Sequence, residues 1–143
     1  MGDGAALADR IAERRAGVGD PGALVGELRR ALVLVPYDRG GLWTAEFGGV
    51  RWVCGFTDEA ALARFAEERA VVDGAGVVER AWEYATFRGA RLLDEVIPAM
   101  GVPAGVAVNI ADPDASMLFP PVVGIVPDAV AVDADVPDEG RGL

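Results

Sequence analysis

A pair of adjacent glycines, Gly48-Gly49, restricts the possible folds of this chain more than any other feature of its sequence. It separates two apolar runs of β-type composition, residues 42–47 and 50–56. Successive glycines can take the positive φ angles of a two-residue hairpin turn, so the two runs should form adjacent antiparallel strands. A third run, residues 32–37, comes before them and is followed by the turn residues Asp38-Arg39-Gly40-Gly41. We therefore predict a three-stranded meander.

Two helical patterns precede these strands. Leu7 and Ile11 lie four positions apart on a narrow apolar stripe, which predicts a weakly anchored first helix. Asp20-Pro21 then supplies an N-cap and a proline for the first turn of a second helix. Leu24 and Leu28 share one face of that second helix and should be buried.

A third helix is expected directly after the hairpin. Thr57 is a suitable N-cap, and acidic residues in the first turn are favourable for the helix dipole. Leu62, Phe65 and Ala66 form an apolar stripe that should face the core. The pattern predicts that this helix ends near Ala70.

The second half of the chain contains both periodicities. Residues 77–88 fit a helix face as well as a strand, and we predict a strand for their second half. Residues 89–100 form an amphipathic helix, which Pro98 should end or kink. Residues 106–110 read as a buried strand. Pro120-Pro121 bars the last apolar stretch from being an ordinary central strand, since proline donates no backbone hydrogen bond.

The length of 143 residues is enough for one hydrophobic core. Combined with the predicted elements, it indicates an α+β fold, a single domain with an antiparallel or mixed sheet packed with helices. We expect an N-terminal helix and linker over residues 1–22, the α+β domain over residues 23–127, and an acidic, partly mobile tail over residues 128–143.

The net charge of −10 argues against several classes of partner. Affinity for nucleic acids rests largely on cationic side chains that displace counterions, so DNA and RNA are poor candidates. Anionic membrane surfaces are disfavoured for the same reason, and no stretch approaches the length of a membrane helix. The N-terminus lacks the apolar run of a signal peptide or anchor.

The composition also removes most catalytic chemistry. All 13 basic side chains are arginine, and there is no histidine. A Ser-His-Asp triad, a conventional zinc site and lysine Schiff-base chemistry are therefore excluded. We expect a protein that is not an enzyme, with no catalytic residues, no cofactor and no metal. Cys54 is the only cysteine, so no internal disulfide forms and a cytoplasmic location is expected.

The tryptophans allow two interpretations. Trp43 and Trp52 fall on adjoining strands of the predicted hairpin, where they could share one face of the sheet. They could be core residues, as could Trp82, or they could form an exposed aromatic platform for a partner. Arg51 and Arg39 could supply polar contacts at the rim of such a platform.

Several segments resemble the N-terminal domain of the SseB family of small bacterial proteins. They are the strand Leu32–Pro36, the strand-to-helix stretch Val53–Phe65, the helix around Leu92-Leu93, the segment Val108-Asn109-Ile110, and Pro120-Pro121. The resemblance covers most of the chain, and the junction from strand to helix is its most characteristic part.

This resemblance implies an α+β sandwich and no established enzymatic activity. After Asn109 such domains often continue with Pro-Gly, whereas this sequence has Ile110-Ala111-Asp112-Pro113. A second, C-terminal domain is not recognisable. The resemblance makes Asn109 a candidate residue, with a structural role in a turn.

The leading hypothesis is a non-enzymatic interaction or regulatory module of the SseB-like type. Its sheet surface around Trp43, Arg51 and Trp52 would contact another, unidentified protein. The sequence leaves the oligomeric state open, and a homodimer is one alternative. The alternatives are a small-ligand sensor with a pocket near Asn109 and Asp112, and an immunity-type inhibitor whose acidic surface covers a basic toxin.

Overall fold

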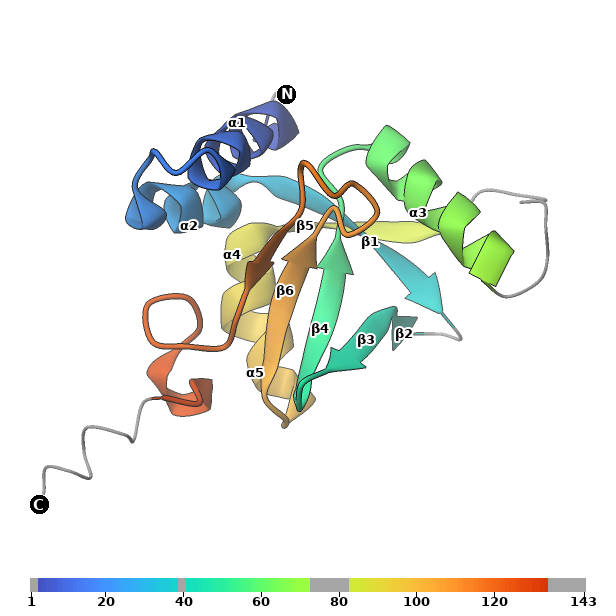
Figure 1. Ribbon diagram of the computed structural model, residues 1–143. Helices are drawn as coiled ribbons and strands as arrows, with labels where there is room; N and C mark the ends of the chain where they lie inside the picture. The colour runs from blue at the N-terminus through green and yellow to red at the C-terminus, as the bar shows by residue number, and fades with distance from the viewer. Residues whose placement is uncertain (1–2, 39–40, 73–82, 134–143) are drawn as a thin grey trace, which may run out of the picture.

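The computed structural model describes residues 3–38, 41–72 and 83–133 (Figure 1). Its larger sheet has the strand order β3-β4-β6-β7, and a second sheet has the order β2-β1-β5. The strands of the larger sheet are β3 (Thr44–Phe47), β4 (Val50–Gly55), β6 (Ala104–Val108) and β7 (Met117–Phe119). Strand β4 runs parallel to β6, whereas β3 and β7 are antiparallel to their neighbours. The predicted α+β class with a mixed sheet is confirmed.

The Gly48-Gly49 hairpin forms as predicted. Phe47 pairs with Val50, and both glycines have positive φ, 64° and 81°. The predicted three-stranded meander is wrong, because β1 (Leu32–Asp38) belongs to the other sheet, between β2 (Gly41–Leu42) and β5 (Tyr84–Arg88).

The two sheets meet at one bridge. Leu34 and Phe56 exchange both backbone hydrogen bonds, at 2.9 and 2.8 Å. The Trp43 N–H also donates to the Pro36 carbonyl, at 2.8 Å, where β2 ends and β3 begins. The predicted strand over residues 42–47 is therefore interrupted at Trp43, and each part pairs with a different partner.

Strand β5 confirms the strand predicted for the second half of residues 77–88. It pairs with β1 in an antiparallel register that joins Pro36 to Tyr84. Residues 77–82 of that prediction, including Trp82, lie outside the described residues.

The predicted helix over residues 89–100 forms, and Pro98 does not end it. Segment α4 (Gly89–Arg91) continues through a π-helical turn, η1 (Leu92–Val96), into α5 (Ile97–Met100). The Ile97 N–H donates to the Leu92 carbonyl, five residues back. Proline has no N–H and its ring clashes with the carbonyl four residues earlier in an α-helix, and the wider turn lets the helix pass Pro98.

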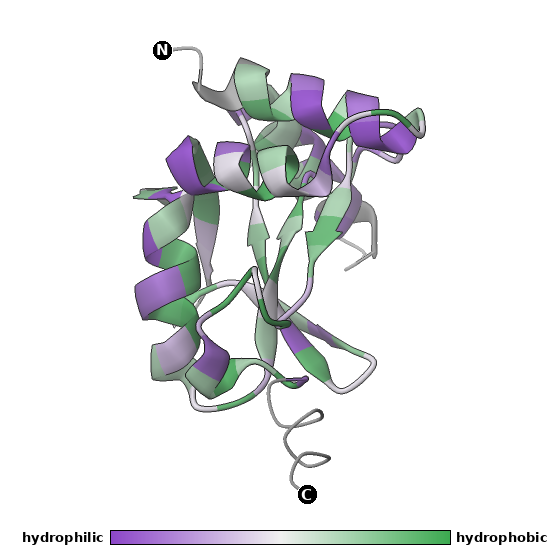
Figure 2. Ribbon diagram, turned by 90° about the vertical axis from the view of Figure 1, so that its left-hand side faces the viewer, coloured by the Kyte–Doolittle hydropathy of each residue, from purple (hydrophilic) through white to green (hydrophobic). Residues whose placement is uncertain are grey.

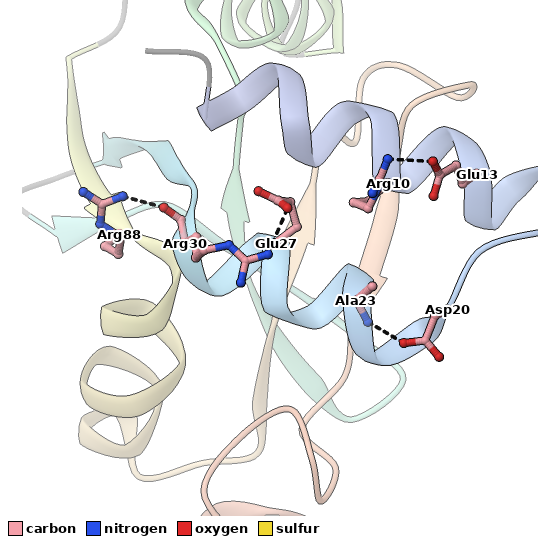
Figure 3. Close-up of polar contacts among 7 residues, drawn as sticks. All are labelled: Arg10, Glu13, Asp20, Ala23, Glu27, Arg30 and Arg88. Atoms are coloured by element: carbon pink, nitrogen blue, oxygen red, sulfur yellow. Dashed lines mark hydrogen bonds and ion pairs between the residues drawn. The ribbon is translucent and has the colours of Figure 1, made fainter.

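The first helix is anchored more firmly than predicted. Helix α1 (Asp3–Arg15) packs on α2 (Pro21–Arg30), and its Leu7 and Ile11 are fully buried in the main core. The expected weak anchoring of α1 is therefore wrong. The predicted cap of α2 is confirmed, because the Asp20 carboxylate accepts a hydrogen bond from a backbone N–H of the first turn at 2.8 Å (Figure 3).

Helix α3 (Glu59–Val72) lies on the other side of the molecule from α1 and α2 (Figure 1). Its N-cap is Asp58, whose carboxylate accepts the Ala61 N–H at 2.8 Å, so the prediction of Thr57 is off by one residue. The predicted apolar stripe of the helix, with Phe65 at its centre, is buried.

The start of the predicted acidic tail is held by contacts. A 3₁₀ turn, η2 (Asp128–Val130), packs against the main core. The Val132 N–H then donates to the Pro121 carbonyl, and the Asp133 carboxylate accepts the Val123 N–H, both at 2.8 Å. The rest of that tail lies outside the described residues.

The apolar side chains gather in two clusters on opposite faces of the larger sheet. Along the helices, hydrophilic and hydrophobic residues alternate (Figure 2). Within the described part of the chain, no helix combines the length and the apolar character that crossing a membrane requires.

Candidate functional site

The register of the larger sheet assigns neighbouring residues to opposite faces. Cys54 pairs with Ala107, and Ala107 with Leu118, so these three side chains form one row across the second face. Val53 and Phe119 point to the first face and belong to the main core. The second face carries the smaller cluster.

Trp52 forms part of the floor of the second face. It is only 7% exposed, and its indole N–H donates to the Phe47 carbonyl at 3.3 Å. Gly105 pairs with Trp52 across the strands, and a Cβ on Gly105 would lie 2.8 Å from the indole ring. The glycine therefore makes room for the indole over β6, and Trp52 is not part of an exposed platform.

Trp43 lies on the same face as Trp52, as predicted, but helix α3 covers it. Its ring meets Phe65 edge to face, with the centroids 5.1 Å apart. The Arg69 guanidinium lies 5.5 Å from the centroid of the Trp43 ring, within cation–π range. Trp52 is thus a core residue, and Trp43 is half-buried and packs against α3.

Arg51 lies on the first face, away from the tryptophans. Its guanidinium donates to the Thr44 hydroxyl at 3.2 Å and lies 3.5 Å from the Glu46 carboxylate. Glu46 is directly opposite Arg51 in the register. The expected placement of Arg51 at the rim of a tryptophan platform is therefore wrong.

Beyond the area covered by α3, the second face has exposed apolar residues on its edge strands. A hollow of about 170 Å³ lies there, and all of its lining residues are apolar. They are Ala45, Phe47, Trp52, Cys54, Ala107, Ile110 and Leu118, and we call this surface the apolar hollow. Phe47 is 73% exposed and Leu118 is 50% exposed. Large apolar side chains with this exposure, grouped around one hollow, are typical of binding surfaces.

Asn109 holds the junction between β4 and α3. Its side chain accepts the Thr57 N–H and donates to the Thr57 hydroxyl, both at 3.1 Å. Asn109 is buried and has a φ of 54°, a left-handed conformation that asparagine tolerates better than most residues. These contacts support the structural role in a turn.

Asp112 is paired with Arg64 of α3. The guanidinium donates to both carboxylate oxygens, at 2.5 and 2.7 Å, and this hydrogen bonding raises the pKa of Arg64. Asn109 and Asp112 do not line the apolar hollow. The two residues support the sheet-to-helix junction.

Cys54 has the properties of a packing residue. It is buried, and desolvation raises its pKa to about 12. A thiol with such a pKa is protonated at neutral pH, and the thiolate is the reactive form. Among the residues that the structure describes, no group of three or more acidic, cysteine or histidine side chains is placed to hold a metal ion.

Among the residues of the apolar hollow, the sequence analysis identified only Trp52 as a candidate. Phe47 lies beside Gly48-Gly49 and Leu118 lies two residues before Pro120-Pro121, so each is on a short strand next to a break. A large apolar residue at such a position is a weak signal of exposure, because the same pattern ends many buried strands.

Comparison with known proteins gives no match. No family model, no curated protein and no solved structure is similar to this chain. The resemblance to the N-terminal domain of the SseB family stays a prediction.

Proposed function

We propose that this chain is a non-enzymatic interaction module of the SseB-like type, which binds a partner protein through the apolar hollow. The observation that carries the proposal is the exposure of Phe47 and Leu118 beside a hollow lined only by apolar side chains. A partner side chain seated there would remove both residues from water, which is the main favourable term in protein association.

The architecture of the hollow fits an anchoring site. Its floor is fixed, because Trp52 and Cys54 are buried and belong to paired strands. Preorganised apolar pockets that accept one large side chain are typical of binding hot spots, since little side-chain entropy is lost on binding. The matching partner segment presents one large apolar residue.

The charge of the chain indicates what surrounds that residue in the partner. With a net charge of −10, the protein attracts basic surfaces and repels acidic ones. We therefore propose a partner segment with an apolar anchor flanked by arginine or lysine. The chain has one cysteine and it is buried, so the proposal includes a reducing compartment such as the cytoplasm.

The test is a paired capture experiment followed by binding of the purified partner. The double variant Phe47→Ser/Leu118→Ser removes the apolar rim of the hollow without touching its buried floor. The control is Val18→Ser/Val123→Ser, which replaces two valines that are 60% and 48% exposed elsewhere. Circular dichroism and thermal melts establish that all variants fold.

A partner captured by the wild type and the control but lost by the hollow variant supports the proposal. Its affinity for the purified chain should also fall as the salt concentration rises, since salt screens exposed charges. The proposal fails if the partner binds the hollow variant equally well. It also fails if sedimentation shows that the hollow instead joins two copies of this chain.

A further inference from the structure

A groove lies on the first face of the larger sheet, on the opposite side from the apolar hollow. It runs between the helix of residues 89–100 and strands from both sheets, and its volume is about 460 Å³. Its lining consists of Leu42, Thr44, Val53, Phe87, Arg91, Glu95, Val96, Ala99 and Met100. Small-molecule sites have volumes of about 300–1,000 Å³. The groove therefore has room for a small ligand.

The helical wall of the groove is the part of the molecule with irregular geometry. Glu95 and Val96 belong to the π-helical turn, and Arg91 comes directly before it. Single π-turns inside α-helices occur often at functional sites. Here the turn lets the helix continue past Pro98 and present Ala99 to the groove.

The groove is apolar along most of its lining and polar at a few points. Arg91 and Glu95 form an ion pair, with 3.2 Å between Nε and Oε1. Both side chains are largely exposed, so the pair is weak and open to competition from a ligand. Across the groove, the Thr44 hydroxyl accepts a hydrogen bond from Arg51 and keeps its own proton for donation.

These groups define complementary requirements for a ligand. Arg91 and Thr44 offer donors, which need an acceptor such as a carbonyl oxygen. Glu95 offers an acceptor, which needs an N–H donor. Within the described residues, the terminal nitrogens of Arg91 have no protein partner, so they are available to a ligand.

We propose that this groove binds a small uncharged carboxamide with an apolar tail. The carbonyl oxygen accepts from Arg91 or Thr44, the amide N–H donates to Glu95, and the tail lies along the apolar lining. A carboxylate in place of the amide would face the Glu95 carboxylate, and an ammonium would face the Arg91 guanidinium. The neutral ion pair at the mouth therefore selects an uncharged head.

The test is a titration followed by two-dimensional NMR with three matched probes: hexanamide, hexanoate and hexylammonium. Hexanamide should give saturable shifts of the backbone amides of Thr44, Val53, Val96 and Ala99. Hexanoate and hexylammonium should bind about tenfold more weakly, because each loses a hydrogen bond to a charged group.

Two variants locate the site and identify the selecting group. Ala99→Trp fills the groove from an exposed helix position and should abolish binding of hexanamide, whereas Ala63→Trp, an exposed alanine of α3, should not change it. Glu95→Gln removes the negative charge at the mouth, and it should reduce the preference for hexanamide over hexanoate.

The proposal is overturned if hexanamide gives no saturable shifts, or if hexanoate or hexylammonium binds wild-type protein as tightly as hexanamide. It is also overturned if Ala99→Trp retains the affinity of the wild type while its spectrum shows a folded protein. The hollow variant Phe47→Ser/Leu118→Ser should bind hexanamide normally, since the two surfaces lie on opposite faces of the sheet.

Discussion

The two faces of the larger sheet carry similar apolar residues and have different surroundings. On the first face, Val53, Val106 and Phe119 are buried beneath the helix of residues 89–100 and the N-terminal helices. On the second face, α3 covers only the part next to β1, and Leu118 at the far edge stays half exposed. The residues alternate along the same strands, so the backbone cannot account for the difference.

What differs is the number of elements that pack on each face. Strand β6 is an uninterrupted apolar run, the pattern of a strand covered on both sides. All five β6 residues are buried, but on the edge strands of the second face Phe47 and Leu118 are 73% and 50% exposed. The apolar character of the second face therefore exceeds what the fold of the chain itself uses, and this excess supports the proposed binding surface.

The sharpest way to test the comparison is to truncate neighbouring residues on opposite faces. Phe119→Ala leaves a cavity in the main core and should lower the free energy of unfolding by about 3–5 kcal/mol. Leu118→Ala, one position earlier, should change it by about 0.5 kcal/mol or less. Urea unfolding of both variants measures the difference, and equal losses would show that the second face is not open.

A smaller effect is expected at Gly105 of β6, where the backbone of β7 and the Trp52 ring come close. A Cβ at Gly105 would clash with the Phe119 carbonyl oxygen and would lie 2.8 Å from the Trp52 ring. Gly105→Ala should therefore destabilise the protein by about 1–3 kcal/mol through overpacking. Gly41→Ala is the control, because a Cβ there meets nothing within 4 Å. Thermal melts of equal concentrations decide whether the two substitutions differ.

The junction that carries α3 onto the second face gives a third test. Asn109→Ala loses both hydrogen bonds to Thr57 and puts alanine at positive φ, so it should cost about 1–2 kcal/mol. Asn109→Gly loses the same hydrogen bonds, but glycine takes a positive φ without strain. The free energy of unfolding should therefore fall less than in Asn109→Ala. If both variants are equally unstable in denaturant, the backbone conformation contributes nothing.

The smallest effect concerns the outer side of the helix that covers the first face. Hydrogen bonds from Arg29 lower the pKa of Asp94 in the folded protein. Because the pKa of Asp94 is lower in the folded protein, its ionised carboxylate stabilises the fold at pH values above the ordinary pKa of aspartate. This stabilisation is lost as the pH falls through the pKa of the folded protein. Asp94→Asn should thus cost about 0.5 kcal/mol at neutral pH, since the pair is exposed, and nothing in strong acid.

Urea titrations of the wild type and Asp94→Asn at neutral and at acidic pH measure this difference. A gap between the two proteins that stays constant with pH would mean that the ion pair does not contribute.

Much of this fold follows from local patterns in the sequence. The hairpin at Gly48-Gly49 and the cap at Asp20 were each predicted from the chemistry of a few neighbouring residues. Long-range pairing could not be predicted. Nothing near Leu32 indicates that its strand joins β5, because that choice depends on how whole elements pack.

The candidate site was predicted in part. The shared face of Trp43 and Trp52 follows from strand alternation, but their burial depends on α3 and on Gly105. The exposure of Phe47 and Leu118 depends on which elements do not pack on them, and the local sequence gives only a weak signal for that. The π-helical turn before Pro98 could not be predicted either, because it forms only where the helix continues past the proline.

The parallel pairing of β4 with β6 has a consequence for the order of folding. Thr57 and Asn109, which close this pair at its end, lie 52 positions apart in sequence. A growing chain therefore holds β4 without its central neighbour until β6 has left the ribosome, and the cost of closing so long a loop slows the final step. During this interval the hairpin is an open template for other strands, and its protection depends on how fast synthesis completes the sheet.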